Sequence, residues 1–200
     1  MTNIPKSWPK KREQIFRSNI DWWHNACLSY YPDQLDMHAL GYKHAGDFLA
    51  QHVIKTRRHQ DVLVYPLVFL YRQYLELQLK ELIKAGSLLI DKSQGFHKHH
   101  KIDVLWRHCR KILKEAYAED CSEDFDAVED CIKQFSEHDP TSTAFRYPID
   151  EKGKKSLPGL IHINLKNFSE IMDNLASLLD AARTGISYYL DIKWGMESSI

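Results

Sequence analysis

Three charged side chains recur at every fourth position of the stretch "YRQYLELQLKEL": Arg72, Glu76 and Lys80. On an α-helix this spacing places one charged stripe along an otherwise apolar surface. Such a stripe can form a buried ion-pair network, line a functional pocket or lie on a solvated helix edge. Because large apolar residues such as Tyr65 and Phe69 border it, we favour the buried network, which needs partners from elsewhere in the chain.

The segment "HDPTSTAFRYPID" offers a partner for this stripe. Arg146 lies between two aromatic residues, so in an extended segment its side chain points to the opposite face from theirs. We therefore expect Arg146 to meet Glu76 in a buried, bidentate pair. Asp139 and Pro140, followed by Ser142 and Thr143, predict a hydroxyl-rich turn just before it.

A histidine-rich segment, "HKHHKIDVLWRHC", is the third candidate for chemistry. Its histidines match no standard metal-ligand spacing, so we predict no metal site there. Either one of these histidines packs on or bonds to a neighbouring helix, or the segment forms a basic surface suited to a phosphate backbone. The residues of that basic patch are Lys98, Lys101, Arg107, Arg110 and Lys111.

Composition restricts the classes of protein to consider. The 200 residues are 44% hydrophobic and carry 27 basic against 27 acidic side chains, which is typical of one globular domain over residues 1–200. The balanced charge does not by itself indicate nucleic acid or membrane binding. Four scattered cysteines, no signal peptide and no apolar run long enough to span a bilayer favour a cytoplasmic protein with reduced thiols.

Apolar periodicity predicts an all-α, up-and-down bundle of about six helices, with its core over 36–190. Pro66 and Gly86 are expected to mark the first turn and the end of the central helix. In the second helix we expect an inward face of Leu40, His44, Phe48 and Leu49. Around 143–163 a small β-hairpin or extended insertion is expected, with Pro148 restricting it to an edge. The predicted helices cover 11–31, 36–52, 66–86, 102–118, 122–138 and 165–190.

Two of these segments carry a resemblance to a known family. "LYRQYLELQLKELIKAG", followed by a histidine-containing loop and "IDVLWRHCRKIL", resembles the core of the HEPN superfamily over about residues 40–190. In that family a helix of the type E-x-x-L-K-x-L-L precedes a loop, a His-x-L pattern and another helix. The chain also looks like a group of bacterial proteins that join this core to an "FRYP" segment.

The resemblance implies an all-α, commonly dimeric protein. Many HEPN proteins are metal-independent endoribonucleases of toxin–antitoxin, CRISPR or phage-defence systems. Their R-x(4–6)-H motif, usually near the last helix, supplies a histidine for attack by the ribose 2′-hydroxyl and an arginine for the phosphate. This chain departs from that pattern, because Arg183 on the last helix has no histidine after it. Its one such spacing is "RSNIDWWH", from Arg17 to His24.

The resemblance therefore indicates an RNA-directed protein of prokaryotic defence or toxin–antitoxin type. It would either bind RNA with a degenerate motif or cut RNA without metal or cofactor, with a homodimer, RNA and a partner protein or antitoxin as expected partners. The candidate catalytic histidines are His24 and His100, and the candidate phosphate contacts are Arg17, Arg72 and Arg146. The alternative is a non-catalytic interaction or scaffold subunit, in which the aromatic residues serve core and interface.

Overall fold

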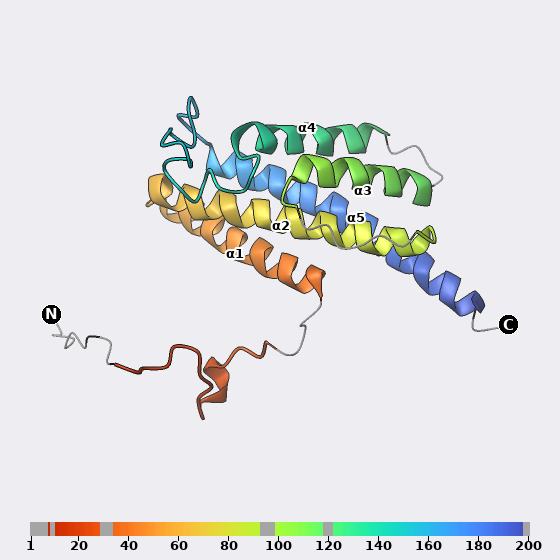
Figure 1. Cartoon of the computed structure of the whole chain (residues 1–200), viewed down its shortest axis with the longest axis horizontal. Coiled ribbons are helices and arrows are strands. Elements are labelled where there is room, and N and C mark those ends of the chain that lie inside the picture. The colour runs from red at the N-terminus through yellow and green to blue at the C-terminus, as the bar shows by residue number, and fades with distance from the viewer. Residues whose placement is uncertain (1–7, 9–10, 29–33, 93–98, 118–121, 198–200) are drawn as a thin grey trace. The chain divides into compact units, whose positions relative to one another are not determined.

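The structure is a computed structural model that describes residues 8, 11–28, 34–92, 99–117 and 122–197. It divides the chain into two units, 1–33 and 34–200. The second unit contains five α-helices and, in its described residues, no β-strand, which confirms the all-α prediction (Figure 1). They are α1 (Leu35–Thr56), α2 (Gln60–Leu89), α3 (Ile102–Ala116), α4 (Ser122–His138) and α5 (Leu165–Glu197).

Helix α2 is the central element of this unit. It contacts α1, α3 and α5, while α4 packs on α3 and α1 also meets α5. Figure 1 shows α1 along one side of α2, with α3 and α4 along the other. Buried side chains cover most of the circumference of α2, as expected of a helix enclosed by others. They include Leu67, Tyr71, Leu75, Leu79, Leu82 and Ile83.

The predicted ends of this central helix were wrong at both Pro66 and Gly86, which lie inside α2. Pro66 is on an exposed face of the helix. It has no N–H to bond the main-chain carbonyl one turn earlier, and water can bond that carbonyl instead. Gly86 is buried, and a Cβ atom there would lie only 2.5 Å from Cγ2 of Ile112 on α3. This glycine allows close helix packing and does not end the helix.

The predicted inward face of α1 was also largely wrong. Phe48 is 72% exposed and Leu40 43% exposed, and His44 is exposed as well. The residues that α1 buries are mostly small: Ala39, Gly46, Ala50 and Val53. A Cβ atom on Gly46 would lie 3.2 Å from the ring of Tyr71, so the helices approach closely at this point. The close approach of α1 to α2, and not the size of the apolar side chains, therefore determines which face of α1 is buried.

A polar cluster ties α1 to α2 and α5 beside this contact. The Lys43 ammonium lies 2.7 Å from the Asp47 carboxylate and 2.6 Å from that of Asp173 on α5. The Tyr71 hydroxyl donates to Oδ1 of Asp47 at 2.8 Å. We name these four residues the Asp47 cluster. Tyr71 is buried, but the three charged side chains are partly open to solvent, with Lys43 12%, Asp47 27% and Asp173 60% exposed.

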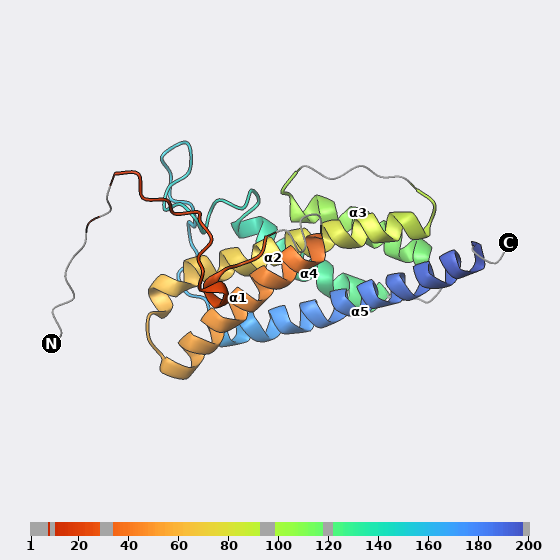
Figure 2. The same cartoon turned by 90° about the horizontal axis from the view of Figure 1, so that it is seen from below.

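The insertion between α4 and α5 is irregular and contains no hairpin. Its described residues hold one isolated antiparallel bridge, Ile149 with Lys155. The turn between them is held by Asp150, whose Oδ1 accepts the main-chain N–H groups of Lys152 and Lys154. Main-chain bonds across this turn run from Asp150 to the Lys154 carbonyl and from Ser156 to the Pro148 carbonyl, which is too short a pairing to form strands. In Figures 1 and 2 the insertion gathers at the end of the bundle where α1 joins α2.

The predicted helix over 11–31 was wrong for the part of this range that the structure describes. Residues 11–28 form an irregular chain with one 3₁₀ turn, Trp22–His24. Asn19 and Asn25 explain this outcome: the Asn25 side chain bonds both the N–H and the carbonyl of Asn19, and Asn19 accepts from the N–H of Asp21. These bonds compete with helical backbone bonds. The bulky side chains of the segment are exposed, including Phe16 at 98% and Trp23 at 93%.

The remaining helices follow the predicted ranges, with small shifts at their ends. α5 continues seven residues beyond the predicted end at Leu190, and its C-terminal part projects past the other helices (Figure 2). Six helices were expected, whereas the described residues form five α-helices and the short 3₁₀ turn. Among the described helices, none is both long enough and apolar enough to cross a bilayer.

Candidate functional site

The charged stripe on α2 lies inside the protein. Arg72, Glu76 and Lys80 are only 0%, 1% and 5% exposed. The prediction that this stripe faces the interior is therefore confirmed. Charges removed from water in this way need ionic and hydrogen-bonding partners. The partners come from the loop before α3 and from the end of α4, and together they form what we name the Glu76 cluster: Arg72, Glu76, Lys80, His100 and Asp139.

Glu76 is the central acceptor of this cluster. Its Oε1 lies 2.9 Å from Nζ of Lys80 and 2.8 Å from Nδ1 of His100, and its Oε2 lies 3.4 Å from Nη1 of Arg72. Burial alone would raise the pKa of Glu76, but the bonds from Lys80 and His100 outweigh it and hold the pKa below its ordinary value. Glu76 is therefore a carboxylate at neutral pH.

Arg72 connects the stripe to two chain segments that are distant in sequence. Its Nη2 donates to the main-chain carbonyl of His100 at 2.8 Å, and its Nε donates to that of Asp139 at 3.1 Å. Burial lowers the pKa of Arg72, while the charges of Asp139 and Glu76 oppose this effect. The guanidinium thus fixes the loop before α3 and the end of α4 against α2.

Asp139 belongs to the cluster although sequence reasoning did not place it there. It is 1% exposed, and its Oδ2 lies 3.6 Å from Nε of Arg72. Its Oδ1 accepts the main-chain N–H groups of Thr143 and Ala144, at 2.7 and 2.9 Å. The pattern Asp-Pro followed by hydroxyl residues did predict a turn, but it could not reveal that the second carboxylate oxygen meets Arg72.

The predicted pair of Arg146 with Glu76 does not form. Arg146 is exposed, its Nε donates to the Ser142 carbonyl at 2.6 Å, and its guanidinium lies 5.5 Å from the ring centre of Phe69. The prediction assumed an extended segment, whereas the N–H groups of Arg146 and Tyr147 both bond the Thr143 carbonyl in a turn. The turn directs Arg146 outward, although its charge is still close enough to Arg72 to lower the pKa of that residue further.

His100 is the member of the cluster that reaches solvent. Its side chain is 65% exposed, while Nδ1 is held on buried Glu76. Because a carboxylate oxygen can only accept, Nδ1 of the neutral imidazole carries the proton and Nε2 carries the lone pair. In the described part of the chain, Nε2 has no partner. A histidine oriented by a buried carboxylate, with its second nitrogen exposed, can act as a general base.

The structure does not bring Arg17 and His24 together. Nδ1 of His24 lies 2.6 Å from Asp21, both side chains are more than half exposed, and no contact with Arg17 occurs in the described residues. The helical spacing that would align the two residues is missing, because this segment is not an α-helix.

The basic patch on α3 is interrupted by acids. Arg110 is paired with Asp126 and Glu129 of α4, and Arg107 lies 3.6 Å from Asp103. Lys101 and Lys111 are exposed. Lys98 and His97 lie outside the described residues. The exposed cations of this face thus lie among carboxylates, unlike those of a uniformly positive surface.

Metal-ligand chemistry and disulfides were sought over the same residues. No group of three or more histidine, cysteine or acidic side chains that could hold a metal ion occurs among them. Cys27, Cys109 and Cys131 form no disulfide in this part of the chain, and burial raises the pKa of Cys109. Cys121 lies outside the described residues. The most distinctive chemical arrangement described is therefore His100 on Glu76.

Comparisons of the chain with family models, with curated proteins and with solved structures gave no match. The geometry of the Glu76 cluster therefore provides the main argument for function.

Proposed function

We propose that this chain is a HEPN-like, RNA-directed protein of prokaryotic defence or toxin–antitoxin type, with His100 as its acid–base residue. The observation that supports this proposal is the 2.8 Å bond from Nδ1 of exposed His100 to buried Glu76. It fixes the ring orientation and tautomer, as a general base requires. The arrangement differs from the R-x(4–6)-H motif, because His100 is paired with a carboxylate of another element and not with an arginine that shortly precedes it in sequence.

The reaction that fits this geometry needs no metal. Nε2 of His100 accepts the proton of a ribose 2′-hydroxyl, and the resulting oxygen attacks the adjacent phosphorus. The bond from phosphorus to the 5′-oxygen breaks, and the protonated His100 returns the proton to that leaving oxygen, which yields a 2′,3′-cyclic phosphate. Glu76 stabilises the imidazolium between these two steps, because it is a buried carboxylate in direct contact with the ring.

Arg146 is the described cation best suited to hold the phosphate. Its guanidinium is exposed, yet it is restrained by the Ser142 carbonyl and by the rings of Phe69 and Tyr147. A restrained arginine can present two parallel donors to phosphate oxygens. Arg72 is unsuitable for this role because it is fully buried and already bonded within the Glu76 cluster.

A second candidate function is a non-catalytic interaction subunit, possible because apolar side chains remain exposed on α5. Tyr188 is 63% exposed, Trp194 51% and Met196 66%, all in the C-terminal third of α5. Exposed aromatic and methionine side chains are enriched at protein interfaces. In this alternative the Glu76 cluster only locks two loops onto α2, and a homodimer or a partner protein would cover the end of α5.

RNA cleavage in EDTA distinguishes the two functions. We expect the native chain to cut single-stranded RNA and the His100→Gln variant to lose about 10²–10⁴-fold in rate. His44→Gln is the matched control, because His44 is also exposed but lies on α1. His24→Ala tests the sequence motif and should retain activity. Circular dichroism checks that each variant is folded.

Two results would contradict the catalytic proposal. If His100→Gln cuts RNA as fast as the native chain, His100 is not the base. If the native chain neither cuts RNA nor binds it, the interaction subunit is favoured. If the native chain binds RNA without cutting it, a salt-sensitive loss of affinity in Arg146→Gln would support the RNA-binding form of the proposal.

A further inference from the structure

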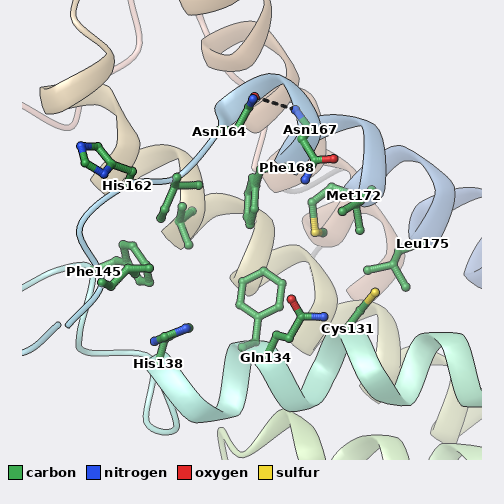
Figure 3. Close-up of a pocket in the computed structure, with 15 residues that line it drawn as sticks. Cys131, Gln134, His138, Phe145, His162, Asn164, Asn167, Phe168, Met172 and Leu175 are labelled. Carbon is green, nitrogen blue, oxygen red and sulfur yellow. Dashed lines mark hydrogen bonds between the residues drawn. The ribbon is translucent and has the colours of Figure 1, made fainter. Parts of the chain in front are cut away.

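A pocket of about 240 Å³ lies between α4 and α5, beside the insertion (Figure 3). Its floor is apolar and buried, with Val68 of α2 at 2% exposure and Met172 of α5 at 1%. α4 packs mainly on α3, which leaves this space open on the side of α4 that faces α5. The helices on either side belong to the same unit as the core.

Three aromatic rings from three different elements form the walls. They belong to Phe135 on α4, Phe145 in the insertion and Phe168 on α5. The rings of Phe135 and Phe168 are 5.8 Å apart and inclined at 64°. Aromatic walls of this kind favour a flat ring as the occupant, because ring faces and edges attract one another in offset or edge-to-face arrangements.

The rim of the pocket is polar and consists of amide and imidazole side chains. Gln134 and His138 line it from α4, and Asn167 and His162 line it from the other side. Figure 3 shows the side chains of Gln134 and Asn167 reaching toward the same space from α4 and α5. Among the described residues that line the pocket, none is an acid, a lysine or an arginine. An ionised ligand would therefore find no carboxylate, ammonium or guanidinium partner in this lining.

Two of these amides keep hydrogen-bonding capacity for a ligand. Gln134 uses its Nε2 on the Asp130 carbonyl, which leaves its Oε1 as an acceptor. The Asn167 side chain has no partner in the described residues, so it offers both donors and an acceptor. The neighbouring Asn164 has a structural role, because its Oδ1 accepts the N–H groups of Lys166 and Asn167 at the start of α5 (Figure 3).

We propose that this pocket binds an uncharged small molecule of one or two fused aromatic rings that carries a hydrogen-bonding edge. The aromatic walls favour a ring, the amides of Gln134 and Asn167 favour a hydrogen-bonding edge, and the lack of acid, lysine and arginine side chains disfavours ions. The volume lies below the roughly 300–1,000 Å³ of sites for drug-sized ligands, which limits the occupant to a small ring system. The proposal goes beyond the RNA-directed function and does not depend on His100.

Three ligands of the same ring size test the proposal: 2-naphthamide, naphthalene and 2-naphthoate. All three contain the naphthalene ring system. 2-Naphthamide adds an amide, 2-naphthoate adds a carboxylate, and naphthalene carries no polar group. Binding to the full ¹⁵N-labelled chain is followed by NMR titration. We expect 2-naphthamide to bind at least about fivefold more tightly than naphthalene, which lacks the hydrogen bonds. We expect no binding of 2-naphthoate, and shifts that concentrate on α4, α5 and the insertion.

Variants at the rim and wall locate the site. Gln134→Leu combined with Asn167→Leu removes the polar edge but keeps similar shape, so 2-naphthamide should bind no better than naphthalene. Asn174→Leu is the matched control, since Asn174 is exposed on α5 but does not line the pocket. Phe168→Leu should weaken both ligands about tenfold through the lost ring contact.

Several outcomes would overturn the proposal. Equal affinity for naphthalene and 2-naphthamide would show an unselective apolar groove. Tighter binding of N-acetyltryptophanamide than of 2-naphthamide would assign the pocket to a protein side chain. No binding of any of these probes, or shifts confined to other helices, would exclude the site. All these readings are independent of RNA cleavage, so this proposal and the proposed function can fail separately.

Discussion

The Glu76 cluster and the Asp47 cluster are both built around one carboxylate, and both join α2 to segments distant in sequence. They differ in access to water. The Glu76 side chain is 1% exposed. In the other cluster the side chain of Asp47 is 27% exposed and that of Asp173 is 60% exposed. Among the described residues, the Glu76 cluster also holds more ion pairs, four against two, and all but His100 of its members are buried. When a buried charge loses its partner, water cannot solvate it, whereas water can solvate a partly exposed charge that loses its partner.

The two clusters also differ in what they present to solvent. The Glu76 cluster exposes a single oriented imidazole, His100, above an otherwise buried set of charges. The Asp47 cluster exposes the carboxylate of Asp173. Its lysine and carboxylates hold helices together and orient no exposed base. This difference is why the proposed chemistry is placed at Glu76 and not at Asp47.

The largest expected effect is at the most buried cation. Arg72→Met should lower the free energy of unfolding by about 3–5 kcal/mol, because Glu76 and Asp139 would remain buried without it. Urea unfolding followed by circular dichroism measures the change. Arg107→Met is the matched control, since the Arg107 side chain is 70% exposed, and it should change stability by less than about 0.5 kcal/mol. A loss below about 1 kcal/mol in Arg72→Met would remove the contrast between the clusters.

Glu76→Gln should have the next largest effect. It should lower the free energy of unfolding by about 2 kcal/mol at neutral pH, since two cations lose their shared carboxylate. The pKa of Glu76 is lowered by folding. Its stabilisation is therefore fully present above the unfolded value of about 4.3 and is lost as pH falls through the lower folded value. Urea unfolding at pH 7, 5 and 3.5 should show the native chain and the variant converging in acid. If the difference in free energy of unfolding between the native chain and the variant stayed constant down to pH 3.5 and below, it would contradict the lowered pKa of Glu76.

The smallest expected effect is at the Asp47 cluster. Lys43→Met should lower the free energy of unfolding by only about 0–1 kcal/mol, because water can solvate the freed carboxylates. Burial acts to lower the pKa of Lys43, but its bonds to Asp173 and Asp47 prevail and raise it. This contribution is thus present below the ordinary pKa of lysine and is lost only in alkali. A loss comparable with that of Arg72→Met would show that burial does not separate the clusters.

Part of this architecture could be predicted from the sequence. Apolar residues all round 67–83 correctly indicated a central helix, and the four-residue spacing of Arg72, Glu76 and Lys80 correctly indicated one charged face turned inward. Both follow from helical periodicity, which is local. Which loop residue would meet that face is not local: Arg146 was expected, whereas His100 and Asp139 occupy the positions.

Other features depended on contacts between helices. Gly86 is the usual signal for a helix end, but here it accommodates Ile112 across a close contact. Phe48 was expected inside because it is large and apolar, yet α1 buries its small residues instead. The pocket beside Phe168 is formed by three elements whose spacing along the chain carries no common pattern. Sequence periodicity could not reveal any of these three features.

The central claim is that buried Glu76 holds His100 as a base with Nε2 unprotonated, and its most direct test is the tautomer of that histidine. Two-bond ¹H–¹⁵N correlation spectra of the native chain, recorded in mildly alkaline buffer, report which nitrogen of the ring carries the proton. We predict the proton on Nδ1 of His100 in the native chain and weakening of this preference in Glu76→Gln. A native His100 protonated on Nε2, like an unrestrained histidine, would contradict the account.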